Sequence, residues 1–162
     1  MKDAQTTYSF STMLPATQGW VRDIEVVGKG IGVDLANKTY NSRQIGEKGE
    51  DVAALYLERK GIEILERNWR CSFGEVDIIA REDNTIILLE VKTRTSRNDD
   101  EHVVPELAVG SRKRAKYEKL ALIYLAKQVQ IDSVRFDVAA VRLVDNDTAY
   151  MRYLVGAYEW DY

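Results

Sequence analysis

Residues Gly74–Arg94 have the sequence GEVDIIAREDNTIILLEVKTR, and this stretch decides the fold. It predicts a β-hairpin, because two segments rich in Ile, Leu and Val flank the turn-forming residues Glu82-Asp83-Asn84. Strands that pair across so short a turn are neighbours in a sheet, so the stretch also predicts which side chains lie opposite each other.

The predicted hairpin has one charged face and one apolar face. A two-residue loop pairs Asp77 with Glu90 and Glu75 with Lys92, all on the same face. A three-residue loop would shift the pairing by one residue and separate Asp77 from Glu90. The apolar face should pack in the core, and its expected pairs are Val76 with Val91, Ile78 with Leu89 and Ala80 with Ile87.

The paired carboxylates of the charged face repel each other, and this repulsion must be offset by a positive charge. Directly paired carboxylates have Cβ atoms about 4.5–5.5 Å apart, and at an effective dielectric constant of about 20 they repel by about 3 kcal/mol. An ordinary cross-strand pair contributes about 0.2–1 kcal/mol, so we expect a divalent cation between Asp77 and Glu90. The alternative is a simple solvated face, but the same face turns apolar at Ile79 and Leu88.

The composition fits a single globular domain. The chain has 162 residues, of which 45% are hydrophobic and 30% charged. With one cysteine, Cys71, an internal disulfide is excluded, and one histidine in addition excludes a Cys/His zinc site. Neither a secretory signal nor a membrane span is visible, so we expect a cytoplasmic protein with no membrane partner. The net charge of −3 implies that any nucleic acid is held by a local patch and by metal ions.

The order of expected elements indicates an α/β fold. Periodicity and turn residues predict a helix over Ile45–Lys60, a strand over Ile62–Trp69, the hairpin, a helix from Arg112 to about Gln128, and strands over Val134–Val144 and Ala149–Val155. This αβββαββ order predicts a mixed sheet, containing a hairpin and flanked by helices, over residues 44–162. Residues 1–43 are expected to be a partly disordered N-terminal extension, with a strand at Trp20–Val27.

The second helix begins with an unusually basic segment, RKRAKYEK. Cations at a helix N-terminus oppose the helix dipole, and this invites a functional interpretation. Arg112, Lys113 and Lys116 are the candidates for contact with the phosphates of a nucleic acid. A solvated, lysine-rich helix face is an equally good explanation.

The carboxylates suit a hard cation. Mg²⁺ binds one or two carboxylates and keeps several waters, and Asp77, Glu90 and a helix-borne Glu50 offer such oxygens. Lys92 follows Glu90 by one side-chain period of the strand. It could position an attacking water or neutralise charge that develops on a phosphate.

These residues resemble a known active site. Asp77 with Glu90-Val91-Lys92 resembles the PD-(D/E)XK site of restriction-endonuclease-like nucleases. A wider set of motifs resembles the uncharacterised YraN-like family of bacterial proteins, which is related to archaeal Holliday junction resolvases. The motifs are Gly49-Glu50, Tyr56-Leu57, Gly61, Arg67-Asn68-Trp69-Arg70, Gly74-Glu75-Val76-Asp77, Glu90-Val91-Lys92 with Arg94, Lys113, and Arg135-Phe136-Asp137-Val138.

The resemblance implies a restriction-endonuclease-like core that binds nucleic acid. It further implies an endonuclease that uses Mg²⁺ or Mn²⁺ to hydrolyse phosphodiester bonds in DNA, with branched or damaged DNA as the candidate substrate. Asp77, Glu90 and Glu50 would then be the metal ligands and Lys92 the catalytic lysine, with Glu75 as an accessory. Several nuclease relatives act as dimers, which leaves a homodimer open.

The chain also departs from the family pattern. No proline precedes Asp77, and the loop after Arg94 carries the acidic run Asp99-Asp100-Glu101. The second hypothesis is therefore a non-catalytic nucleic-acid-binding or interaction module with a vestigial metal site.

Overall fold

The computed structural model describes residues 7–16, 19–27, 39–95, 111–126, 131, 133–145 and 147–157, and only the backbone of residues 7–16, 19–27, 111 and 112. Its elements are β1 (Thr7–Ala16), β2 (Gly19–Val27), α1 (Ser42–Arg59), β3 (Glu63–Cys71), β4 (Gly74–Glu82), β5 (Thr85–Thr95), α2 (Ser111–Leu125), β6 (Ser133–Leu143) and β7 (Thr148–Val155). From α1 onward the order is the predicted αβββαββ. Strand β2 coincides with the strand expected at Trp20–Val27, whereas β1 was not predicted.

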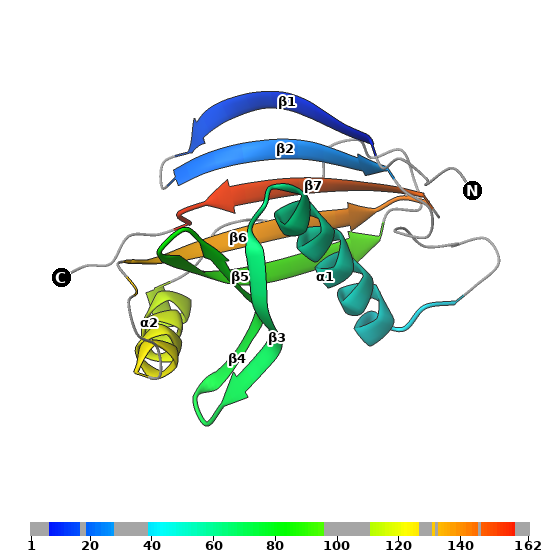
Figure 1. Ribbon diagram of the computed structural model, residues 1–162. Coiled ribbons are helices and arrows are strands. Elements are labelled where there is room, and N and C mark those ends of the chain that lie inside the picture. The colour runs from blue at the N-terminus through cyan, green and yellow to red at the C-terminus, as the bar shows by residue number, and fades with distance from the viewer. Residues whose placement is uncertain are drawn as a thin grey trace.

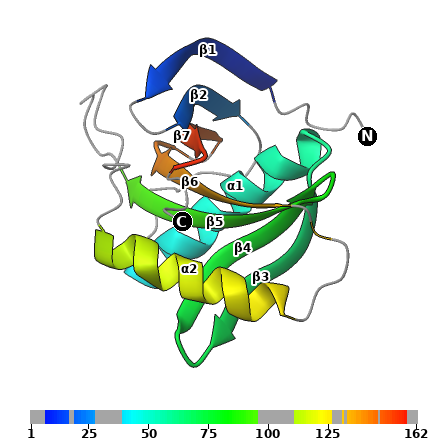
Figure 2. The same cartoon turned by 90° about the vertical axis from the view of Figure 1, so that its left-hand side faces the viewer.

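The strands form one mixed sheet in the order β1-β2-β7-β6-β5-β4-β3. Strands β5 and β6 are parallel and are connected through α2, and the other neighbours are antiparallel. Helices α1 and α2 cover opposite faces of the sheet (Figures 1 and 2). This confirms the predicted α/β class. The proposed division of the chain at residue 44 stays a prediction.

Helix α1 begins three residues earlier than predicted because Asn41 caps it. The Asn41 side chain accepts a hydrogen bond from the Gln44 backbone nitrogen at 2.9 Å, and the Gln44 side chain accepts one from the Asn41 nitrogen at 3.1 Å. Such a reciprocal capping box satisfies two backbone donors at a helix start. The helix ends where the sequence predicted, because Gly61 adopts a left-handed φ of 76°.

The predicted register of the central hairpin is confirmed next to its turn. The ladder between β4 and β5 runs from Glu82–Thr85 to Ile78–Leu89, which is the register of a two-residue loop. Asp83 in that loop has a φ of 52°, a conformation that Asp tolerates better than most residues.

Farther from the turn the predicted pairing is wrong. Among the described residues of β4 and β5, the ladder stops at Ile78–Leu89, so Asp77–Glu90, Val76–Val91 and Glu75–Lys92 are not ladder pairs. The physical reason is that β4 leaves β5 and continues with β3. Their own ladder extends to Cys71–Gly74, and it places Arg70 opposite Glu75.

Each face of the sheet carries its own core. Ile78, Ala80, Ile87 and Leu89 pack with α1, as predicted for the apolar face. Ile79 and Leu88 pack with α2, and so does Val76, which was predicted to share a face with Ile78. Strand β4 therefore twists between Val76 and Ile78, at Asp77. Burial of each large aliphatic side chain stabilises the fold by about 1.5–3 kcal/mol. Neither α1 nor the described part of α2 is long and apolar enough to cross a membrane.

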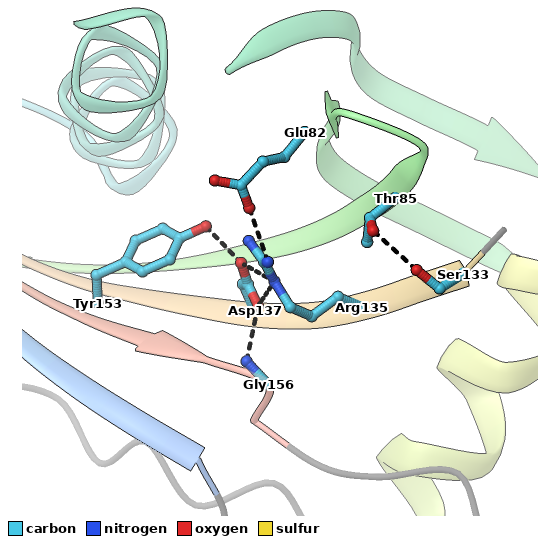
Figure 3. Close-up of polar contacts among 7 residues, drawn as sticks. All are labelled: Glu82, Thr85, Ser133, Arg135, Asp137, Tyr153 and Gly156. Atoms are coloured by element: carbon cyan, nitrogen blue, oxygen red, sulfur yellow. Dashed lines mark hydrogen bonds and ion pairs between the residues drawn. The ribbon is translucent and has the colours of Figure 1, made fainter. Parts of the chain in front are cut away.

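A buried polar network joins β6 and β7 to the end of β4 (Figure 3). The Asp137 carboxylate accepts hydrogen bonds from Arg135 Nε at 3.0 and 3.1 Å, from the Tyr153 hydroxyl at 2.7 Å and from the Gly156 nitrogen at 2.8 Å. Arg135 also donates through Nη1 to Glu82 at 2.8 Å. Burial raises the pKa of Asp137, and the Arg135 charge opposes that rise. The Arg135-Phe136-Asp137-Val138 motif thus anchors the fold.

Candidate metal and nucleic-acid site

The candidate site forms where β4 and β5 separate. Beyond the last ladder pair, the Asp77 side chain takes the place of a strand partner, since its Oδ2 accepts a hydrogen bond from the Val91 backbone nitrogen at 2.7 Å. The carboxylate is therefore held between the two strands. At this opening, side chains from both faces of the sheet can approach it.

Asp77 lies among other carboxylates. Its pKa is raised from 3.8 to about 6, mainly by desolvation on burial and further by repulsion from Glu50, Glu90 and Glu75, while the Val91 hydrogen bond opposes the rise. A raised carboxylate pKa caused by burial and like charges is a feature of functional sites. The structure thus brings Asp77, Glu50 and Glu90 into one electrostatic cluster, although the direct strand pairing expected for Asp77 and Glu90 is absent.

Glu50 reaches the cluster from α1. Its side chain is largely buried, and its Oε2 accepts a hydrogen bond from Asn68 Nδ2 at 2.9 Å. The Arg67 guanidinium lies 3.8 Å from the same oxygen and makes a closer ion pair, 2.8 Å, with Asp51. Glu50 is therefore oriented by β3.

Gly49 explains how α1 comes so close to β5. A Cβ built at Gly49 would lie within 2.8 Å of the Thr93 Cβ, which is too close for any side chain. Thr93 Oγ1 is buried there and has no hydrogen-bond partner within the described part of the chain. The absence of a side chain at Gly49 thus allows the helix contact that brings its neighbour Glu50 to the site.

Sequence reasoning assigned no role to Gly49 or Asn68. A glycine inside a helix costs about 1 kcal/mol relative to alanine and often marks close packing, so Gly49 did carry a usable signal. Asn68 stood only within the Arg67-Asn68-Trp69-Arg70 motif, and its bond to Glu50 could not be predicted, because its left-handed φ of 51° within β3 is visible only in the structure.

Glu90 already has a partner from α2. Lys113 Nζ forms an ion pair and hydrogen bond with Glu90 Oε1. The Lys113 side chain is partly exposed, and the Glu90 side chain is largely buried. Lys113 therefore offsets part of the Glu90 charge, a contact that the sequence did not predict, and the cation expected between Asp77 and Glu90 stays a prediction. Lys92, two residues farther along β5, points to the same side of the sheet as Glu90.

The remaining predicted residues lie at the periphery. Glu75 is exposed, and its Oε2 is 3.2 Å from Arg70 Nε. Lys116 on α2 lies against Gly74, where a Cβ would collide with its Cε. The side chain of Arg112, the third predicted phosphate contact, lies outside the described residues.

The donor set fits a hard cation chemically. Glu50, Asp77 and Glu90 offer only carboxylate oxygens, the ligands that Mg²⁺ and Mn²⁺ prefer. Within the described residues, however, no three Asp, Glu, His or Cys side chains are already grouped closely enough to hold a metal ion. Asn68 and Lys113 each occupy an oxygen of one carboxylate. Binding of a cation therefore requires small side-chain rearrangements.

A mixed sheet with a helix on each face, and acidic and basic residues where its central hairpin opens, defines an α/β protein whose architecture is compatible with a restriction-endonuclease-like core. Residues 49–141 match the profile of the Uncharacterised protein family UPF0102. The chain belongs to this family, in agreement with the YraN-like resemblance of its motifs.

Individual relatives agree with this assignment. A UPF0102 protein of Geobacter metallireducens is 49% identical over 102 residues, covering 62% of this chain and 81% of that protein. One from Syntrophotalea carbinolica is 42% identical over 125 residues, covering 76% and 98%. Among solved structures, Pyrococcus furiosus SfsA in complex with Ca²⁺ is 14% identical with a TM-score of 0.37, over 82% of this chain and 77% of that one, a likeness too low to carry an argument.

Proposed function

We propose that this protein is a nucleic-acid-binding, divalent-metal-dependent endonuclease that hydrolyses phosphodiester bonds in DNA. The observation that carries the proposal is the burial of Asp77 among Glu50, Glu90 and Glu75, which raises its pKa to about 6. Buried carboxylates this close repel one another, and a bound cation would stabilise their ionised forms.

In this proposal each residue has a defined task. Asp77, Glu90 and Glu50 would hold Mg²⁺ or Mn²⁺. When bound, the cation would withdraw charge from the phosphate oxygens and make water a stronger nucleophile at neutral pH. Lys92 would neutralise negative charge as it develops on the phosphate.

The basic start of α2 supports a phosphate-binding role. Lys113 contacts Glu90 on β5, and Lys116 lies beside Gly74, the first residue of β4, so each lysine lies at one of the two strands that carry Asp77 and Glu90. With a cation on Glu90, Lys113 would be released toward a phosphate group. Charge–charge contacts of this kind make DNA affinity fall steeply with salt.

Cleavage assays test the proposal directly. The purified full chain is incubated with Mg²⁺ or Mn²⁺ and with duplex, single-stranded, forked and four-way DNA, and Glu90→Gln and Lys92→Met are expected to lower the cleavage rate by about 10²–10³-fold. Glu63→Gln is a matched control, because Glu63 pairs with Arg81 at the surface of β3. If Glu90→Gln and Glu63→Gln cleave equally well, the site assignment is wrong.

A second candidate function is nucleic-acid binding without cleavage. One observation favours it, namely that Lys113 satisfies Glu90 without any metal. This module would bind DNA in a salt-dependent manner, and its binding would survive Glu90→Gln. The melting temperature with and without Mn²⁺ separates the two candidate functions. If the metal site is intact, Mn²⁺ raises the melting temperature of wild type but not that of Asp77→Asn, whereas a module without a metal site shows no shift in either protein.

A further inference from the structure

The hairpin of β3 and β4 continues beyond the sheet as a two-stranded arm (Figure 1). The arm consists of residues 67–77, which pair with each other as far as Cys71–Gly74, whereas the β4–β5 ladder begins only at Ile78. One face of the arm packs on α2, where the Trp69 and Tyr124 ring centroids are 5.4 Å apart in an edge-to-face arrangement. The arm therefore projects beyond the sheet while one of its faces packs on α2.

Phe73 lies in the two-residue turn at the tip of this arm. Its side chain is 56% exposed, in a type of position where Gly, Asn or Asp is usual. Among the described side chains, the other exposed large hydrophobic residues are Leu122 and Tyr150. The Tyr150 ring already has a cationic neighbour, because the Arg142 guanidinium lies 4.8 Å from its centroid. The Phe73 ring contributes little to the folded core and is available for a partner.

Cationic side chains flank the tip. Arg70 is 73% exposed and pairs with the similarly exposed Glu75 across the arm. Lys116 from α2 lies against Gly74, directly after Phe73. An exposed aromatic ring with cationic groups nearby is the combination that proteins use to bind single-stranded nucleic acid, because the ring stacks on a base while the cations follow the backbone.

The tip lies at a useful distance from the candidate site. Phe73 lies in the turn directly before β4 and precedes Asp77 by four residues; since a strand rises about 3.3 Å per residue, the two are about 13 Å apart at most along the chain direction. Neighbouring bases of one DNA strand are about 3.4 Å apart along the helix axis. A ring at this position would meet a base about four steps from a phosphate held at Asp77.

We infer that Phe73 stacks on an unpaired base, so that the protein binds DNA with a single-stranded segment beside the scissile phosphate in preference to continuous duplex. In a continuous duplex each base is already stacked on its neighbours and offers no free face. The inference rests on the proposed function, and it specifies the substrate class as forked, flapped or gapped DNA.

Equilibrium binding without metal tests the inference. The probes are a fluorescent duplex and a fork of the same length with 2-aminopurine in its unpaired arm. Wild type should prefer the fork and change the 2-aminopurine fluorescence. Phe73→Ala should weaken fork binding about 5- to 100-fold, with little effect on duplex binding, whereas Phe73→Trp should retain both the affinity and the fluorescence change. Leu122→Ala, at a site that is 60% exposed on α2, should behave as wild type.

The possible results separate this inference from the endonuclease proposal. If Phe73→Ala binds the fork as tightly as wild type, or if Leu122→Ala weakens it equally, the stacking role is overturned, even for a chain that cleaves DNA. If wild type shows the Phe73-dependent fluorescence change but never cleaves, the stacking role is supported and the endonuclease proposal fails. A wild type that binds neither probe overturns the stacking role, and the metal-dependent cleavage assay then decides the endonuclease proposal by itself.

Discussion

Asn68 on β3 donates a 2.9 Å hydrogen bond from its side-chain nitrogen to Oε2 of Glu50 on α1. It does so from a left-handed backbone conformation, with a φ of 51° in the middle of a strand. Such a conformation costs most residues about 1–2 kcal/mol, although Asn tolerates it better than most, and strained residues of this kind cluster at functional sites. Asn68 thus orients Glu50, one of the ligand candidates, through one of its two carboxylate oxygens.

We predict that Asn68→Gly weakens metal binding but leaves the stability of the fold almost unchanged. Glycine adopts this φ without strain, so the free energy of unfolding should stay within about 1 kcal/mol of wild type. The loss of the amide should weaken Mn²⁺ binding about 10- to 100-fold, as is typical when a residue that orients a ligand is removed. Isothermal titration and urea denaturation provide the two measurements. Asn68→Ala should be less stable than Asn68→Gly, and equal stability of the two would contradict the strain argument.

Two glycines in α1 should respond oppositely to alanine. Gly49→Ala introduces a methyl group against Thr93 and should cost about 1–3 kcal/mol. Gly46→Ala, in the same helix, meets no atom within 4 Å and should stabilise the protein by up to about 1 kcal/mol through helix propensity. Thermal denaturation of both variants checks this. Thr93→Ala should recover part of the Gly49→Ala loss, and additive effects in the double variant would argue against direct contact.

The pKa of Asp77 predicts how stability depends on pH. Because burial and neighbouring carboxylates raise this pKa from 3.8 to about 6 in the folded state, the folded protein binds the proton more tightly than the unfolded chain does. Stability from this group is therefore full below pH 3.8 and is lost as the pH rises to about 6. A difference of about two pKa units corresponds to at most about 3 kcal/mol.

Asp77→Asn should remove this pH-dependent loss. Without metal, the variant should gain up to about 3 kcal/mol at pH 8 and nothing at pH 3.5, because Asn keeps an acceptor for the Val91 nitrogen but carries no charge. Urea titrations at both pH values provide the measurement, with Asp51→Asn, an exposed carboxylate on α1, as the control. A gain that is the same at both pH values would point to packing rather than charge.

The sequence predicted the parts of this structure that depend on local pattern. Alternating apolar residues and the Asp83-Asn84 turn fixed the register next to the loop, and the helix and strand order followed. The departure of β4 from β5 at Asp77 could not be predicted in this way, because it depends on tertiary contacts, the packing of Val76 with α2 and the Asp77–Val91 hydrogen bond. The same holds for the Lys113–Glu90 contact, since α2 is far from β5 in sequence.

The Asp137 network should matter for stability far more than a surface ion pair. Arg135→Met leaves a carboxylate buried without its charge partner and should cost about 3–5 kcal/mol. The matched control is Arg81→Met, which breaks an exposed pair with Glu63 and should cost about 1 kcal/mol or less. Chemical denaturation compares the two. If both substitutions cost the same, the network does not anchor the fold.

The position of β2 has a consequence for how the protein avoids aggregation. Strand β2 pairs with β7 from Trp20–Val155 to Val27–Thr148, so β7 has a hydrogen-bonded neighbour on each side. Without the β1–β2 hairpin, the backbone of β7 would be an open edge, able to template strands of other chains. The N-terminal hairpin therefore covers the edge of β7, the strand that carries Tyr153, and makes β1 the edge strand of the sheet.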